Sequence, residues 1–317
     1  MVDVSDVGIT LLIRHWVERF VDGAAVVLSI ATLPIEQGAS GADIGRVRVT
    51  YSCGAESADV DVVLKRCSPL ERGVLAHLGR ATPRHVPLVV MEESDNGGIG
   101  WVGMQDLGNT SRPDSLSPLS SRLRRLEAEA LADIHAENRT VGDSVQGLPE
   151  ADRDYYDWAI ERQFFRPAWC RSATDRAFRR QFASAIDTVE AVADTIVDAM
   201  VTLSEDERWC TLIHTDINPS NVLIFDGQPY FIDWDTARTG PLFLDVPHHF
   251  CTRSQAEHYR LALVRRGFTI ESAEFTRAYR VAAQYTGLRY IWWTLQGWDG
   301  SLNSTRWVDH YLQMIVR

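Results

Sequence analysis

The sequence predicts an α+β protein with two lobes, a small lobe of β-strands with helical cover followed by a larger and mostly helical lobe. Its 317 residues are enough for two lobes and a sizeable core. Alternating and β-branched residues are frequent in the first third of the chain, a pattern typical of strands. Later in the chain, apolar residues recur at the spacing of amphipathic helices.

The small lobe is predicted to begin with an amphipathic helix over Val7–Phe20 and to contain a second helix over Glu71–Leu78. A turn at Gly54 separates two of its strands. The predicted strands are Ala24–Ile35, Arg46–Ser52, Val60–Lys65, Val86–Glu92 and Gly100–Met104.

Two glycine-containing segments of the small lobe are candidate phosphate-binding loops. Gly98–Gly103 matches the dinucleotide fingerprint GxGxxG, which requires a helix directly after it. A Ser- and Pro-rich stretch lies beyond it instead, so we interpret these glycines as part of a hairpin. The loop Gln37–Asp43, with Ser40 and Gly41, could place backbone N–H groups against phosphates, and a plain hairpin turn explains it equally well.

The larger lobe is predicted to consist mainly of helices. One helix is expected over Ser120–Asn138, and the chain from Asp152 to Leu203 is expected to be helical with a break near Pro167. The C-terminal part, Ser254–Arg317, is predicted to be helical and is rich in aromatic residues. Aromatic residues at this density more often form a core than a binding site.

The composition argues against nucleic-acid and membrane partners. The formal charge of −11 leaves no basic stripe to collect phosphates, and no apolar stretch approaches the length of a membrane span. The first helix carries charged residues and does not resemble a signal peptide, so the cytoplasm is the expected location. The five scattered cysteines form no CxxC pair and are expected to be buried free thiols. The oligomeric state stays open.

The segment from Leu212 to Asp235 carries four polar residues at the ends of short apolar strands, where loops bring them together. These residues are His214, Asp216, Asn221 and Asp233, and a hairpin at Asp226–Gln228 lies between the last two. Phosphoryl transfer needs such a set, because one carboxylate receives the proton of an attacking hydroxyl while an amide oxygen and a second carboxylate bind Mg²⁺. Ordinary turn chemistry explains any one of them alone, but poorly explains all four at this spacing.

This segment resembles the aminoglycoside phosphotransferase and choline kinase-like family, whose members read close to HGDxxxxN and IDWxxA. The corresponding segments here are His214–Asn221 and Ile232–Ala237. The resemblance implies a protein-kinase-like fold with Asp216 as the catalytic base and His214 shaping its loop. It also implies that Asn221 and Asp233 bind Mg²⁺ and that Asp245 braces the loop.

Lys65 is the only lysine of the chain and lies at the end of a predicted strand. A compact ammonium suits phosphate oxygens better than a bulkier guanidinium. By the same resemblance, Lys65 would hold the phosphates of ATP, or of GTP, with Glu71 as its ion-pair partner. The backbones of Gln105 and Leu107 would contact the adenine. The implied division is a nucleotide-binding lobe over residues 1–104, a linker over 105–109 and a catalytic lobe over 110–317.

The expected acceptor site combines acidic and aromatic residues. At helical spacing Asp154, Asp157, Trp158 and Glu161 share one face, in a region that lines the acceptor site in the family that the sequence resembles. Trp292 and Trp298 are expected to complete the site by stacking. A solvated acidic face and core tryptophans are the alternatives. We interpret His135 and the pair His248–His249 as structural.

The predicted reaction is ATP- and Mg²⁺-dependent phosphorylation of a hydroxyl group on a small molecule. Only eleven residues separate Asp233 from Asp245, and no Ala-Pro-Glu tripeptide follows, so the chain lacks a segment to present a polypeptide. The leading acceptor is an antibiotic of aminoglycoside, peptide or nucleoside type, with resistance or self-resistance as the outcome. A metabolite such as choline, an amino sugar or a nucleoside-like compound is the alternative. A catalytically inactive nucleotide-binding regulatory protein is the third hypothesis, against which the intact Asp216, Asn221 and Asp233 argue.

Overall fold

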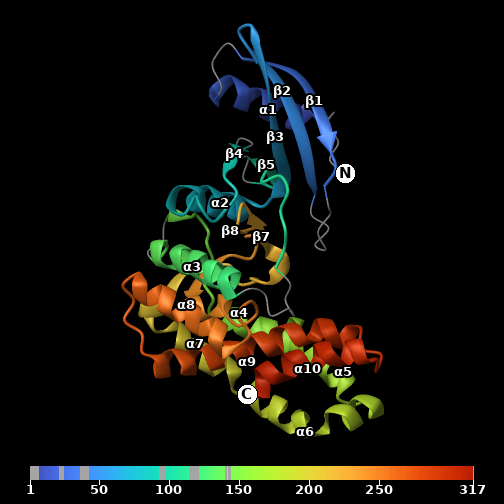
Figure 1. Ribbon diagram of the computed structural model, residues 1–317. Helices are drawn as coiled ribbons and strands as arrows, with labels where there is room; N and C mark the ends of the chain where they lie inside the picture. Colours follow the sequence, from blue (N-terminus) through green and yellow to red (C-terminus); the bar gives the residue numbers. More distant parts are fainter. Residues whose placement is uncertain are drawn as a thin grey trace. The chain divides into compact units, whose positions relative to one another are not determined.

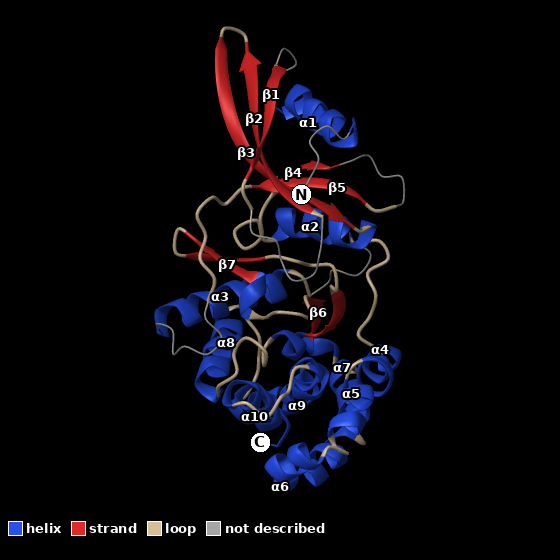
Figure 2. Cartoon of the chain, turned by 90° about the vertical axis from the view of Figure 1, so that its right-hand side faces the viewer, coloured by secondary structure: helices blue, strands red, loops and turns tan. Residues whose placement is uncertain are grey.

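The computed structural model of the protein describes residues 7–20, 25–35, 43–92, 98–113, 121–139, 141 and 144–316. The chain forms two compact units (Figure 1). The first unit consists of Met1–Pro113, Asp143–Gly147 and Ser220–Ala237, and the second of Asp114–Gly142, Leu148–Pro219 and Arg238–Arg317. Strands concentrate in the first unit and helices in the second, which confirms the α+β prediction (Figure 2).

The division between the units differs from the expected one. The first unit extends to Pro113, beyond the predicted linker at 105–109, and it also takes in the segment Ser220–Ala237. Backbone hydrogen bonds explain this, because Ile224 and Ser111 exchange both of theirs at 2.7 and 3.1 Å. The Phe231 amide also donates to the His85 carbonyl at 2.8 Å. A boundary drawn along the sequence could not anticipate such pairing.

The first unit is built on a five-stranded antiparallel sheet of order β1-β2-β3-β5-β4 (Figures 1 and 2). Its strands are β1 Val26–Leu33, β2 Ile44–Cys53, β3 Glu56–Cys67, β4 Val89–Glu92 and β5 Gly100–Gln105. Gly54 has a φ of 64°, which supplies the left-handed backbone needed to join β2 to β3 in a tight hairpin. Gly98 precedes strand β5, and Gly100 and Gly103 of the GxGxxG match lie within it, so two of these glycines belong to the second strand of the β4–β5 hairpin, as predicted.

Helices cover the sheet of the first unit. Helix α1 (Val7–Phe20) has the predicted bounds, and its buried Ile9, Ile13 and Val17 pack with the valines of β2 and β3. Helix α2 (Pro69–Ala81) begins at the Ser68 cap, whose hydroxyl accepts from the Glu71 amide at 3.1 Å. A proline at the first helical position fits this start, since its missing N–H would lack a helical partner anyway.

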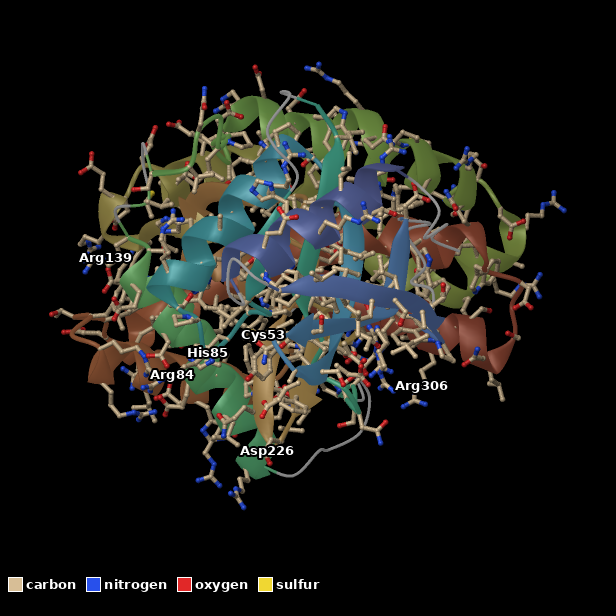
Figure 3. All side chains as sticks on the ribbon, turned by 90° about the horizontal axis from the view of Figure 1, so that it is seen from above. Cys53, Arg84, His85, Arg139, Asp226 and Arg306 are labelled. Carbon is tan, nitrogen blue, oxygen red and sulfur yellow. The ribbon has the colours of Figure 1, made fainter. Side chains whose placement is uncertain are left out.

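A second hairpin completes the first unit. Strands β7 (Val222–Phe225) and β8 (Gln228–Phe231) pair antiparallel, as the sequence predicts. Asp226 and Gly227 both have positive φ, at 49° and 71°, as a two-residue type I′ turn requires. Asp226 is exposed at this turn (Figure 3).

The second unit is mostly helical (Figure 2). Its helices are α3 Ser121–Glu137, α4 Arg153–Asp157, α5 Phe165–Ser172, α6 Arg176–Ala193, α7 Ile196–Ser204, α8 Arg253–Arg265, α9 Ser272–Gln296 and α10 Leu302–Val316. A short ladder of β6 (Cys210–Ile213) and β9 (Arg238–Pro241) lies among them. One core cluster joins aromatic side chains such as Tyr156, Trp169 and Tyr285 to aliphatic side chains of α9 and α10.

The helical break predicted near Pro167 lies at Phe164, shortly before the proline. Pro167 is in the first turn of α5, where a missing N–H costs no helical hydrogen bond, and the chain breaks at Phe164. Before the break, Trp158–Gln163 form a π-helix (η2), closed by the bond from the Phe164 amide to the Ala159 carbonyl at 3.0 Å. The spacing assumed for one acidic face, from Asp154 to Glu161, is therefore wrong beyond Asp157.

The free cysteines are less buried than expected. All five are free, yet only Cys67 is buried, and Cys170 is exposed. The expectation failed because Cys170 lies on the solvent side of α5, which cysteine count and spacing do not reveal. Within the part of the chain that the structure describes, no helix has the length and apolar character needed to cross a membrane.

Gly287 allows α9 and α10 to pack closely. A Cβ atom there would lie 2.6 Å from Ile315 Cγ1 and 2.9 Å from the Tyr311 carbonyl oxygen. We expect Gly287→Ala to lower the free energy of unfolding by about 1–3 kcal/mol through overpacking, more than the gain in helix propensity of about 1 kcal/mol. Chemical denaturation measures this. Gly79→Ala in α2 is the control, because its nearest neighbour would be Leu88 Cδ2 at 4.0 Å. An equally stable Gly287→Ala protein would contradict this account of the packing.

Candidate active site

Lys65 lies within an ion-pair network inside the first unit. Its ammonium is 2.5 Å from Glu71 Oε1 and 2.6 Å from Asp233 Oδ1. Lys65 is 8% exposed and Glu71 is 2% exposed, so each buried charge depends on its partner for stabilisation. Burial opposes the charge of Lys65, but the two carboxylates outweigh it and raise the pKa of the ammonium above its usual value. The Ser68 cap starts α2 directly after β3, which is how Glu71 reaches a lysine only six residues before it.

Asn221 and Asp233 are brought close together in the same unit. The Ile232 amide donates to the Asn221 carbonyl at 3.0 Å, which places Asp233 directly beyond this contact. Asp233 has a φ of 69°, a conformation that is uncommon for residues other than glycine and that often marks functional sites. The side-chain oxygens of both residues are hard donors that suit Mg²⁺, which usually takes one or two protein ligands together with phosphate and water. In the described residues no group of three His, Cys, Asp or Glu could hold a metal ion.

The expected adenine-contacting segment is part of the first unit. The Gln105 amide donates to the Leu88 carbonyl at 2.8 Å, so the sheet already uses this donor. Asp106 forms an ion pair with Arg46 and accepts from the Gly108 amide at 2.7 Å. Leu107 is buried. Ser40 and Gly41, which were expected to contact phosphates, lie outside the described residues.

The loop that carries Asp216 is fixed in the second unit by Asp245. The two carboxylate oxygens of Asp245 accept from the amides of His214 and Thr215, each at 2.7 Å. Asp245 Oδ2 also lies 3.1 Å from His135 Nε2, and His135 Nδ1 lies 2.5 Å from the Tyr259 hydroxyl. His135 is fully buried and hydrogen-bonded, as predicted for a structural histidine. The geometry agrees with the bracing role expected for Asp245.

His214 contacts the same loop from within. Its side chain is fully buried, and its Nδ1 lies 3.3 Å from the Asp216 amide, which donates to it. Asn218 reaches back with its amide to the Asp216 carbonyl at 3.2 Å. The loop therefore has local hydrogen bonds in addition to those of Asp245.

Two residues that sequence reasoning missed contact this loop from α9. Arg289 Nη1 donates to the Thr215 carbonyl at 2.8 Å, and the Tyr290 hydroxyl donates to Asp216 Oδ1 at 2.6 Å. Both belong to the second unit, as do Thr215 and Asp216. The only sequence signal was the aromatic density of this helix, which we interpreted as core.

The histidine pair occupies two different environments. His248 packs on Tyr290 with ring centroids 4.1 Å apart, and burial lowers its pKa to about 4, so the ring is neutral near pH 7. His249 Nε2 lies 2.9 Å from both Glu127 Oε2 and Arg124 Nη1, where burial again lowers its pKa. Each ring is thus held by its own packing and polar contacts.

Comparison with known proteins places the chain in a family. The phosphotransferase enzyme family matches residues 35–285. The chain belongs to this family. A search of curated proteins by sequence finds no match.

Solved structures of family members resemble the chain in fold. A spectinomycin phosphotransferase in complex with ADP and spectinomycin has 14% identity and a TM-score of 0.55, covering 91% of this chain and 92% of that one. The GDP complex of an aminoglycoside 2′-phosphotransferase has 14% identity and a TM-score of 0.55, covering 96% and 94%. A choline kinase from Streptococcus pneumoniae has 13% identity and a TM-score of 0.51, covering 96% and 98%. The expected family and its protein-kinase-like fold are thereby confirmed.

The acidic residues expected to bind an acceptor are largely neutralised in this family member. Arg162 lies 2.6 Å from Asp157, and Arg166 lies 3.1 Å from Glu161. Both pairs are five residues apart, a spacing that the π-helical turn brings onto one side. Asp154, in α4, is exposed. Two of the three expected acidic residues therefore already have cationic partners.

The aromatic residues divide into two groups. Trp158 packs edge-on against Phe164 at 5.2 Å, and Phe164 stacks on Trp292 at 5.3 Å. Trp298 packs instead on Phe178 and Phe182 of α6, at 5.3 and 6.2 Å. Ring contacts thus join Trp158 to Trp292 through Phe164, whereas the ring contacts of Trp298 are with α6.

Proposed function

We propose that the protein transfers a phosphoryl group from ATP to a hydroxyl group of a small molecule. The observation that carries this proposal is the position of Lys65, held between Glu71 and Asp233 at 2.5 and 2.6 Å. A buried ammonium beside a carboxylate suited to Mg²⁺ is the arrangement that nucleotide phosphates require. Family members crystallised with ADP and GDP support a nucleotide donor. GTP is the alternative donor.

Each proposed role follows from the chemistry of the residue. Asp216 takes the proton of the acceptor hydroxyl, and His214 and Asp245 hold its loop. Lys65 binds the α- and β-phosphates through its ammonium, and the backbones of Gln105 and Leu107 bind the adenine. Asn221 and Asp233 would hold Mg²⁺, which supplies neutralisation of phosphate charge when bound.

The proposed acceptor is a small molecule, with an antibiotic as the leading class. The eleven residues between Asp233 and Asp245 leave no segment to present a polypeptide. Relatives in the family bind spectinomycin, kanamycin or hygromycin B, which supports this class. A metabolite acceptor is the second candidate, favoured by the likeness to a choline kinase over 96% of this chain. We place the reaction in the cytoplasm, where ATP is available.

The test is an ATP-consumption screen over separate panels of antibiotics and metabolites, with mass spectrometry to detect the added phosphate. Consumption that requires one acceptor, with a product heavier by one phosphoryl group, supports the proposal and decides between the two acceptor classes. Nucleotide binding without transfer to any acceptor would instead favour the inactive regulatory protein. The Asp216→Asn protein serves as the blank.

The acceptor is expected to be recognised by stacking rather than by charge. Phe164, between Trp158 and Trp292, lies 6.0 Å from the Arg289 guanidinium, which itself donates to the Thr215 carbonyl. The aromatic group of Trp158, Phe164 and Trp292 therefore lies close to the loop that carries Asp216, within the second unit.

We therefore expect Trp158→Ala to raise the KM for the acceptor about tenfold, the equivalent of roughly 1.4 kcal/mol of lost contact. The double change Asp154→Asn with Asp157→Asn should alter KM little, because Arg162 already neutralises Asp157. Steady-state kinetics at low and high salt checks both, with the exposed Trp293→Ala as control. A steep, salt-dependent rise in KM for the double variant would reverse this assignment in favour of a polycationic acceptor.

A further inference from the structure

The catalytic loop contains a strained residue. Thr215 has a φ of 68°, in the left-handed region that a β-branched side chain rarely adopts. The corresponding position of the family pattern HGDxxxxN is glycine, which adopts this conformation without steric cost. The chain therefore needs contacts that hold Thr215 in place, because strain of this kind persists only where surrounding structure fixes it.

The contacts come from both sides of Thr215. On its amide side, Asp245 Oδ1 accepts the N–H at 2.7 Å. On its carbonyl side, Arg289 Nη1 donates at 2.8 Å, and the Tyr290 hydroxyl lies 3.1 Å away. Arg289 thus holds this carbonyl, while the adjacent Tyr290, whose single hydroxyl proton is donated to Asp216 Oδ1 at 2.6 Å, lies against the same peptide.

Arg289 is well fixed for this purpose. It is 8% exposed, and the Nη1 atom that holds the Thr215 carbonyl also donates to the Tyr155 hydroxyl at 2.6 Å. Its guanidinium lies 5.1 Å from the ring centroid of Tyr290 and 5.6 Å from that of Tyr155. Burial opposes its charge, but the surrounding tyrosines and Asp216 raise the pKa, so Arg289 remains a cation.

Tyr290 holds the carboxylate of Asp216. Its hydroxyl donates to Asp216 Oδ1 at 2.6 Å, and its ring is fixed between His248 at 4.1 Å and Tyr311 at 6.5 Å. Burial, together with the charge of Asp216, raises the pKa of Tyr290 well above its ordinary value, so the hydroxyl keeps its proton. A rotamer of Asp216 fixed in this way is already oriented before a substrate arrives.

We propose that Arg289 and Tyr290 act as positioning residues that hold the strained Thr215–Asp216 peptide and orient the Asp216 carboxylate. These contacts stabilise a backbone conformation that a glycine at position 215 would adopt without such support. The orienting role rests on the proposed function, because it assumes that Asp216 is the catalytic base. The support of Thr215 does not, because it concerns only the stability of the folded loop.

The kinetic test is Tyr290→Phe, which keeps the ring and removes only the hydroxyl. We expect kcat to fall by about 10- to 100-fold, as for misplacement of a reacting group, with the KM for ATP unchanged. Tyr279→Phe is the matched control, because Tyr279 lies on the same helix and donates to the Phe250 carbonyl at 2.8 Å. A Tyr290→Phe protein with unchanged kcat, or a loss equal to that of the control, would overturn the positioning role.

The strain is tested by a double-mutant cycle with Thr215→Gly, read by melting temperature and kcat. In the native background, Tyr290→Phe should lower the melting temperature by roughly 2–4 °C, the shift for one lost hydrogen bond in a domain of this size. In the Thr215→Gly background both losses should be smaller, since glycine needs less support. Arg289→Gln provides a second cycle with the same expectation. Equal losses in both backgrounds would refute the support of Thr215. The melting temperatures decide this point even if no acceptor is phosphorylated, an outcome that would contradict only the proposed function.

Discussion

Asp216→Asn is expected to lower kcat by about 10²- to 10⁴-fold while leaving ATP affinity nearly unchanged. The asparagine has the same shape, and its Oδ1 can still accept the hydrogen bond that Tyr290 donates at 2.6 Å. The loop amides of His214 and Thr215 remain held by Asp245. The substitution therefore removes the ability to take a proton and little else. Single-turnover transfer and ATP titration measure the two quantities separately.

The matched control for this experiment is Asp226→Asn. Asp226 is exposed in the type I′ turn of the β7–β8 hairpin, where asparagine tolerates the positive φ well (Figure 3). It should retain wild-type kcat. Retention of more than about a tenth of kcat by Asp216→Asn, far above the range for a general base, would exclude Asp216 from that role.

The parts of the site that local sequence determines could be predicted. Asp216, Asn221 and Asp233 lie within one short segment whose strands and turns are set by neighbouring residues, so their spacing alone was enough to predict them as site residues. Lys65 was noticeable because it is the only lysine. Its partner Glu71 was implied by the family resemblance, and the Ser68 cap explains the pairing, because it starts α2 close behind the strand.

The parts that depend on long-range packing could not be predicted. Arg289 and Tyr290 contact the loop that carries Asp216 across 74 residues of sequence, and no spacing rule connects them to it. The π-helical turn before Phe164 likewise depends on packing, and it changes which side chains face each other. Its consequence is chemical, because Arg162 and Arg166 come to neutralise Asp157 and Glu161, which the sequence suggested as an acidic acceptor face.

Lys65→Met is expected to reduce kcat/KM for ATP by at least about 10²-fold, since loss of a preorganised charged donor commonly costs that much. It should also lower the free energy of unfolding by about 3–5 kcal/mol, because Glu71 is left as a buried charge without its cation. Chemical denaturation and steady-state kinetics measure the two effects. With this variant alone, a fall in kcat/KM could come either from lost stability or from lost phosphate binding.

A second substitution separates the two effects. Lys65→Met combined with Glu71→Gln removes both members of the buried pair, so much of the lost stability should return. Activity should not return, because no other lysine exists to replace the ammonium at the phosphates. A double variant that regained both stability and activity would make Lys65 a purely structural residue.

Chemical labelling tests the same assignment in the unmodified protein. Lys65 provides the only side-chain amine of the chain, so a lysine-reactive nucleotide analogue can modify a single side chain. ATP in excess should protect it, since the nucleotide phosphates would occupy the space before the ammonium. Peptide mass spectrometry reads both the position and the protection. Labelling that ATP does not slow would place the nucleotide away from Lys65, and the proposed phosphate contact would then be wrong even if the enzyme transfers phosphate.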